Sequence, residues 1–67
     1  MKLSEEALKQ IKGNDRFILA LAEATNRKSR TIERWLNDND ENLLLEPILH
    51  IIRKRTGMTN KQILDNE

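Results

Sequence analysis

No cysteine occurs in this chain of 67 residues, and that absence limits how so small a domain can be held together. A domain of this size buries only about 60% of its unfolded surface, so it often needs a disulfide, a metal ion or a partner chain. Disulfides are excluded here, and one histidine without cysteine does not supply the ligands of a structural zinc site. We therefore expect one domain over residues 1–67, with no metal and no cofactor, and a second copy of the chain as the remaining source of stability.

The hydropathy of the chain argues against a membrane location. No segment reaches the roughly 20 apolar residues of a membrane span, and the first residues, Met1 to Glu5, lack the apolar core of a signal peptide. We therefore expect a soluble, cytoplasmic protein that does not associate with a membrane.

Helix-start and helix-stop residues divide the chain into five short segments, and no segment is typical of a strand. Ser4 can cap the first helix, and Asn14 or Asp15 can cap the second. Pro47 fits the first turn of the fourth helix, because deeper in a helix it would remove a backbone hydrogen bond. The five predicted helices span about residues 5–12, 15–24, 29–37, 47–56 and 60–64.

Apolar residues fall on one face of each predicted helix, so the segments can share a core. In the third helix, Ile32, Trp35 and Leu36 cluster within roughly 100° around the axis, and we interpret Trp35 as a core residue. Leu19 and His50 point away from the predicted core, and we interpret His50 as a surface side chain. The other predicted inward residues are Leu3, Ala7, Leu8, Ile11, Phe17, Ile18, Leu21, Ala22, Ile48, Ile51 and Ile52.

Positive charge is concentrated in one short element, although the net charge of the chain is only +1. Residues 27–35 hold Arg27, Lys28, Arg30 and Arg34 against a single acidic residue, Glu33, and residues 36–47 then hold four acidic groups and no basic one. Arg30 and Arg34 are four residues apart, so they share a face, which lies opposite the apolar face of the third helix.

The segment Ala22-Glu23-Ala24-Thr25-Asn26 followed by Ser29-Arg30-Thr31-Ile32-Glu33-Arg34-Trp35-Leu36-Asn37 resembles the helix-turn-helix of the phage lambda repressor and Cro family. Ala22 matches that motif's small residue, Asn26 its left-handed turn residue, and Ile32 its branched apolar residue. The motif covers about 20 residues, and the order of the remaining helices also resembles that family's five-helix bundle. Two positions depart from the pattern: Asn26 replaces the usual glycine, and Ile18 stands where many members have a phosphate-contacting glutamine.

The resemblance implies an all-α bundle of five short helices with a helix-turn-helix over about residues 15–37. It also implies a transcription regulator of phage or prophage type, which binds double-stranded operator DNA as a homodimer and lays the third helix in the major groove. We expect base contacts from Ser29, Arg30 and Arg34, with Ser29 also capping the third helix. We expect phosphate contacts from Arg27, Lys28 and Asn37.

Two other classes of function remain to be weighed. Catalysis is not expected, because the chain has no cysteine, no tyrosine and no glycine-rich phosphate loop, and both serines are needed as caps. We therefore expect no enzyme and no small-molecule substrate. The alternative to DNA binding is a small protein-interaction module, such as an antitoxin or an assembly adaptor, that docks through Leu19, the run Leu43–Leu45 and Met58.

Overall fold

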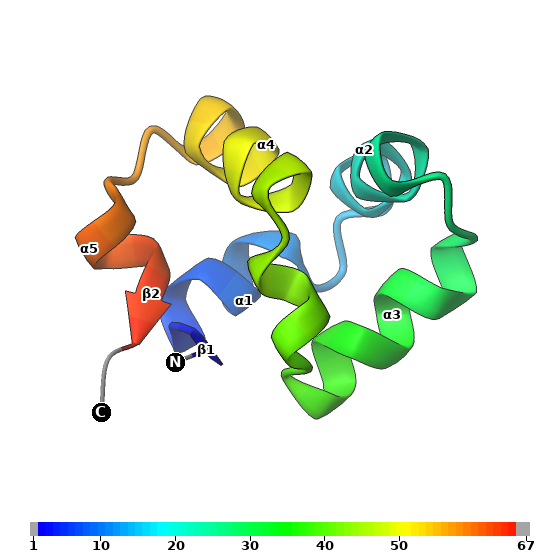
Figure 1. Cartoon of the computed structure of the whole chain (residues 1–67), viewed down its shortest axis with the longest axis horizontal. Helices are drawn as coiled ribbons and strands as arrows, with labels where there is room; N and C mark the ends of the chain where they lie inside the picture. The colour runs from blue at the N-terminus through cyan, green and yellow to red at the C-terminus, as the bar shows by residue number, and fades with distance from the viewer. Residues whose placement is uncertain (1, 66–67) are drawn as a thin grey trace.

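Five α-helices carry the fold in the computed structural model, which describes residues 2–65. The elements are β1 (Lys2–Leu3), α1 (Glu5–Ile11), α2 (Asp15–Thr25), α3 (Ser29–Asp38), the 3-10 helix η1 (Glu41–Leu44), α4 (Glu46–Thr56), α5 (Asn60–Ile63) and β2 (Leu64–Asp65). The predicted all-α bundle of five short helices is confirmed. Figure 1 shows α2 and α3 together at one end of the molecule, with α5 and β2 at the other. None of these helices is long and apolar enough to cross a membrane, as far as residues 2–65 go.

Helices α1, α2 and α5 begin where a side chain satisfies one of their first free N–H groups. The Ser4 hydroxyl accepts a hydrogen bond from the Ala7 N–H at 3.2 Å, and Asn14, rather than Asp15, accepts one from the Phe17 N–H at 3.2 Å. At the start of α5, Thr59 and Gln62 form a reciprocal capping box. These local signals explain why most helix boundaries could be predicted from the sequence to within a residue or two.

A two-stranded sheet joins the two ends of the chain, so the expectation of no strands was wrong. Strands β1 and β2 pair antiparallel, with Lys2 opposite Asp65 and Leu3 opposite Leu64. The Ser4 N–H also donates to the Ile63 carbonyl at 2.7 Å, and the Ser4 hydroxyl donates to the Gln62 carbonyl at 2.6 Å. Strands of two residues are too short to show an alternating pattern, and their partners are far apart in the sequence. Pattern reading could therefore not detect them.

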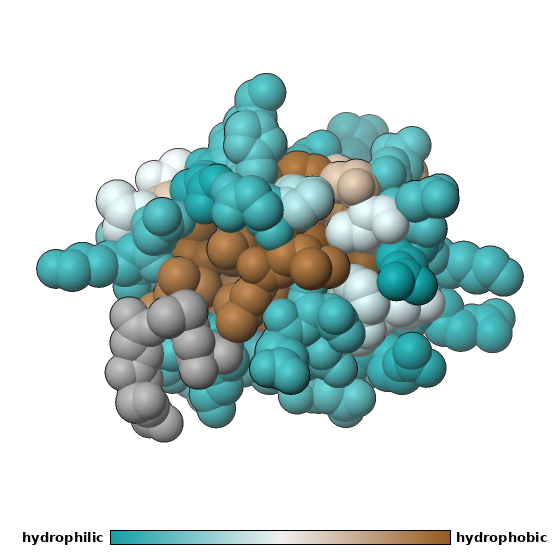
Figure 2. Space-filling view, in the orientation of Figure 1, coloured by the Kyte–Doolittle hydropathy of each residue, from teal (hydrophilic) through white to brown (hydrophobic). Residues whose placement is uncertain are grey.

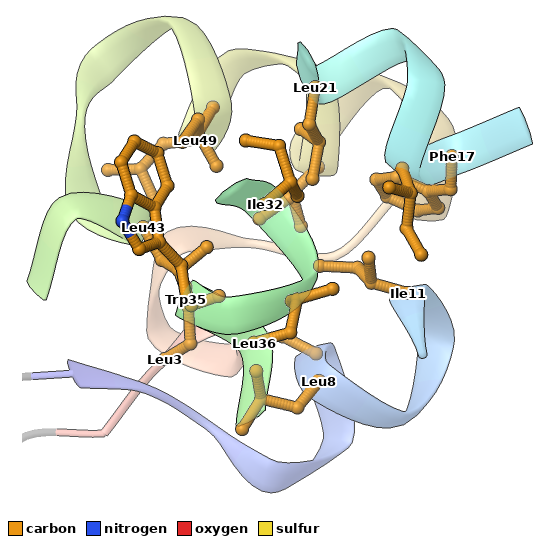
Figure 3. Packing of buried hydrophobic residues seen from close by; sticks show 14 of the residues in the cluster. Leu3, Leu8, Ile11, Phe17, Leu21, Ile32, Trp35, Leu36, Leu43 and Leu49 are labelled. Carbon is orange, nitrogen blue, oxygen red and sulfur yellow. The ribbon is translucent and has the colours of Figure 1, made fainter. Parts of the chain in front are cut away.

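Every residue predicted to face inward from α1, α2 and α3 is buried. In α4 the buried residues are Ile48, Leu49 and Ile52. Ile51, which we predicted to face inward, is only partly buried and packs against the edge of the core. Figure 3 shows the Trp35 indole extending towards Leu43 and Leu49. The rotation of α4 about its axis is thus decided by the residues that it packs against on α2, η1 and α5, and not by its own apolar pattern.

Trp35→Ala should remove a large part of this core. Trp35 is 6% exposed, so the truncation should lower the free energy of unfolding by about 3 to 5 kcal/mol, enough to unfold so small a domain. Thermal melts followed by circular dichroism measure the effect. Leu19→Ala is the matched control, because Leu19 is 52% exposed and its removal should leave the melting temperature almost unchanged. A Trp35→Ala melt equal to wild type would contradict the buried position of the indole.

Candidate nucleic-acid interface

The turn between α2 and α3 is closed by Asn26, which adopts the left-handed conformation with φ 56° and ψ 39°. The Asn26 N–H donates to the Glu23 carbonyl at 3.3 Å, and the Arg27 N–H donates to the Ala22 carbonyl at 2.9 Å. These two bonds are the pair that defines a Schellman end. The expected left-handed turn at Asn26 is therefore confirmed, and it directs the chain out of α2 and into α3 within three residues.

Helix α3 begins at Ser29, but Ser29 is not its cap. The N-cap position belongs to Lys28, which makes no side-chain capping bond. Its backbone carbonyl instead accepts hydrogen bonds from the N–H groups of Thr31 and Ile32, at 2.9 and 3.2 Å. The capping role predicted for Ser29 was therefore wrong by one position. Because the first turn of α3 makes no use of the Ser29 hydroxyl, this half-buried group keeps its hydrogen-bonding capacity for another partner.

The outward face of α3 carries Arg30, Arg34 and Asn37, all exposed. At 100° per residue these three lie within about 60° of one another, on the side opposite the buried face of the helix. The only ion pair within residues 2–65 joins Arg53 to Glu46 at 2.7 Å, so neither Arg30 nor Arg34 is neutralised by a neighbour in this part of the chain. The two guanidinium groups therefore stand side by side on an exposed face.

A groove of about 580 Å³ lies along the turn, between the end of α2 and the start of α3. Three of the predicted contact residues line it together: Arg27, Lys28 and Ser29. The other lining residues are Leu19, Ala22, Glu23 and Asn26. Two cations and an unused hydroxyl thus gather at the N-terminal end of the exposed face of α3.

A second groove, of about 270 Å³, lies where the start of α2 meets the end of α3. Asn37 lines it together with Lys12, an exposed residue that sequence reasoning did not single out. Lys12 lies outside the basic element over residues 27–35, and nothing in the local pattern places it beside α3. Two carboxylates, Asp15 and Glu33, and the buried Ile18 line the same groove.

The structure exposes only some of the residues that were predicted to form a protein-docking surface. Leu19 and Leu45 are 52% and 44% exposed, but Leu43 is fully buried in the core, so Leu43 cannot belong to a docking surface. Leu44 and Met58 are partly buried against the core. His50 is exposed, as predicted. No group of three histidine, aspartate or glutamate side chains is placed to hold a metal ion in the part of the chain that the structure describes.

Comparison of this chain with models of known protein families, with curated proteins and with solved structures found no match.

Replacing Asn26 tests the strain in the turn. An alanine forced into the left-handed region is disfavoured by roughly 1 to 2 kcal/mol, so Asn26→Ala should lower the free energy of unfolding by about 1 kcal/mol. Asn26→Gly should stay within about 0.5 kcal/mol of wild type, because glycine adopts this conformation freely. Denaturant unfolding measures both changes.

Asn39 offers a matched control for that experiment. It is also left-handed, with φ 47°, but its side-chain amide donates to the Leu3 carbonyl at 3.2 Å. Asn39→Gly should therefore destabilise by about 1 kcal/mol through the lost hydrogen bond, whereas Asn26→Gly should not. Equal stability of wild type and Asn26→Ala would show that the turn does not impose the left-handed conformation.

Proposed function

We propose that this protein binds double-stranded DNA in a sequence-specific manner, as a transcription regulator of repressor or Cro type, and that it catalyses no reaction. The observation that carries the proposal is the exposed pair Arg30 and Arg34 on the outward face of α3, directly after a turn closed by Asn26. An α-helix with its side chains is about 10–12 Å across, and the major groove of B-DNA is about 12 Å wide. Helix α3 has the size for that groove, and its outward face carries two cations, Arg30 and Arg34.

Base recognition falls to the outward face of α3. A guanidinium group can donate two parallel hydrogen bonds to O6 and N7 of guanine, the commonest specific contact in the major groove. Arg30 and Arg34 are one helical turn apart, so they would meet neighbouring base pairs. Ser29 is the first residue of α3, and the helix does not use its hydroxyl group. This hydroxyl group is therefore free to add a contact to a base or a phosphate.

We assign the phosphate contacts to residues at the two ends of the outward face of α3. Arg27 and Lys28 line the groove at the turn, and Asn37 and Lys12 line the groove at the other end of α3. Sugar-phosphate strands border the major groove on both sides, so donors at both ends of a reading helix can fix its depth and register. Ile18, at the position where many members of the similar family have a phosphate-contacting glutamine, is buried and apolar. Lys12 would supply a phosphate contact at this end of α3 instead.

A domain of this size makes a limited contact with DNA, and helix-turn-helix proteins commonly read two half-sites as dimers. We therefore propose that two copies bind a palindromic operator, in the cytoplasm of a cell that carries the phage or prophage. The exposed Leu19 and Leu45 favour the second candidate, a protein-interaction module. Salt dependence separates the two, because phosphate contacts release counterions and an apolar protein interface does not.

Arg30→Ala and Arg34→Ala should each change base preference. Each lost guanine contact should weaken binding by roughly 1 to 3 kcal/mol and relax specificity at particular base pairs. The measurement is affinity for a duplex selected from a randomised library and for its single-base variants, by gel shift. If both variants keep the base preferences of the wild type, α3 is not the reader and the proposal fails.

Arg27→Ala and Lys28→Ala should behave differently, because these residues lie in the turn. Each should weaken binding to all duplexes about equally and reduce the slope of log affinity against log salt by about one unit per lost contact. Titrations at several salt concentrations measure the slope, and Lys54→Ala, an exposed cation on α4 outside both grooves, is the control. If the affinity of the wild type for DNA does not change with salt concentration, the protein-interaction module is favoured instead.

A further inference from the structure

A carboxylate stands beside the basic outward face of α3. Glu33 is exposed, and it lines the groove that also holds Lys12 and Asn37. At 100° per residue, Glu33 lies about 60° from Arg30 and about 40° from Asn37 around the axis of α3. Figure 2 shows mainly hydrophilic side chains on the side of the molecule where α3 lies in Figure 1. A helix that meets DNA through Arg30 and Asn37 would therefore bring Glu33 against the DNA as well.

No contact inside the described part of the chain accounts for the charge of Glu33. The one ion pair within residues 2–65 does not include it. Asp15, the other carboxylate in this groove, lies in the first turn of α2, where the positive end of the helix dipole favours an acidic group. Glu33 is the fifth residue of α3, so it lies beyond the turn in which the dipole acts. Its carboxylate therefore remains available to a group outside the protein.

The chemistry of the major groove restricts what a carboxylate can contact there. Phosphates repel it, because like charges repel. The base edges in the major groove offer hydrogen-bond donors only as the N4 amino group of cytosine and the N6 amino group of adenine. The adenine amino group lies next to the N7 acceptor, which repels a carboxylate oxygen, whereas cytosine presents no acceptor on this edge. Cytosine is therefore the base that a carboxylate selects.

We propose that Glu33 reads a cytosine of the operator, by accepting a hydrogen bond from its N4 amino group in the major groove. This inference rests on the proposed function, because it needs α3 in that groove, and it adds a base to those that the arginines select. Glu33 also rejects thymine, which presents the O4 acceptor in place of the amino group. The carboxylate thus lowers the affinity for DNA that lacks the cytosine, and specificity increases through repulsion of the wrong sequences.

The test compares wild type, Glu33→Ala and Glu33→Gln on duplexes selected from a randomised library and on their single-base variants. Wild type should select cytosine at one position, and a change of that cytosine to thymine should weaken its binding by about tenfold or more. Glu33→Ala should bind the cytosine and thymine duplexes within about twofold of each other, and it should bind the thymine duplex more tightly than wild type does. Glu33→Gln should prefer adenine at that position, because a carboxamide matches both N6 and N7.

Asp38→Asn is the matched control, because Asp38 is an exposed carboxylate of the same helix that lines neither groove. It should keep the base preferences of wild type, and circular dichroism confirms that all variants are folded. If Glu33 only balances nearby cations, Glu33→Ala will strengthen binding to all duplexes by the same factor. If Glu33 only orients Arg30, Glu33→Ala will bind no duplex more tightly than wild type. Either result would overturn the proposal.

The same measurements separate failure of this inference from failure of the proposed function. Suppose that wild type selects a duplex whose guanine preferences depend on Arg30 and Arg34, and that Glu33→Ala keeps every base preference. The reading of cytosine is then wrong, and the proposed function stands. If wild type binds all duplexes equally, or binds none, the proposed function fails and the role of Glu33 fails with it.

Discussion

Burial of one face of α3 is the constraint on which the rest of the interface depends. Ile32 is completely buried, and Trp35 and Leu36 are nearly so, so α3 cannot rotate about its own axis without exposing a large apolar area. Because residues on opposite faces of a helix move together, this burial also fixes Arg30 and Arg34 on the exposed side. The core therefore holds the charged face in place, although Arg30 and Arg34 form no ion pair within residues 2–65.

Two further features fix the position of α3: the turn at Asn26 and the link from its C-terminal end to the paired strands β1 and β2. The Schellman end at Asn26 sets the direction in which α3 leaves α2. At the far end of α3, Asn39 repeats the same device: its N–H donates to Leu36, and the next N–H, of Asp40, donates to Trp35. The Asn39 side chain also donates to the Leu3 carbonyl in β1, so the C-terminal end of α3 is tied to the sheet that closes the molecule.

These ties also explain why residues from separate segments of the chain lie close together. Lys12 follows α1 and Asn37 belongs to α3, yet both line one groove because α2 begins against the end of α3. Leu3 and Leu64 lie opposite each other because β1 pairs with β2, and β1 also packs against η1. Each of these combinations depends on contacts between segments that are far apart in the chain.

The sequence by itself determined the features that depend on a few neighbouring residues. Caps at Ser4 and Asn14, the left-handed Asn26 and the apolar stripe of α3 are local, because a hydrogen bond or a helical repeat spans only three or four residues. They were enough to predict the five helices and the outward position of Arg30 and Arg34.

Tertiary structure decided the rest. It paired β1 with β2, turned Leu49 rather than Ile51 into the core, buried Leu43 and brought Lys12 beside Asn37. The physical reason is the same in each case. Which of several apolar or charged side chains is covered depends on what packs across from it, and that partner comes from a distant part of the chain.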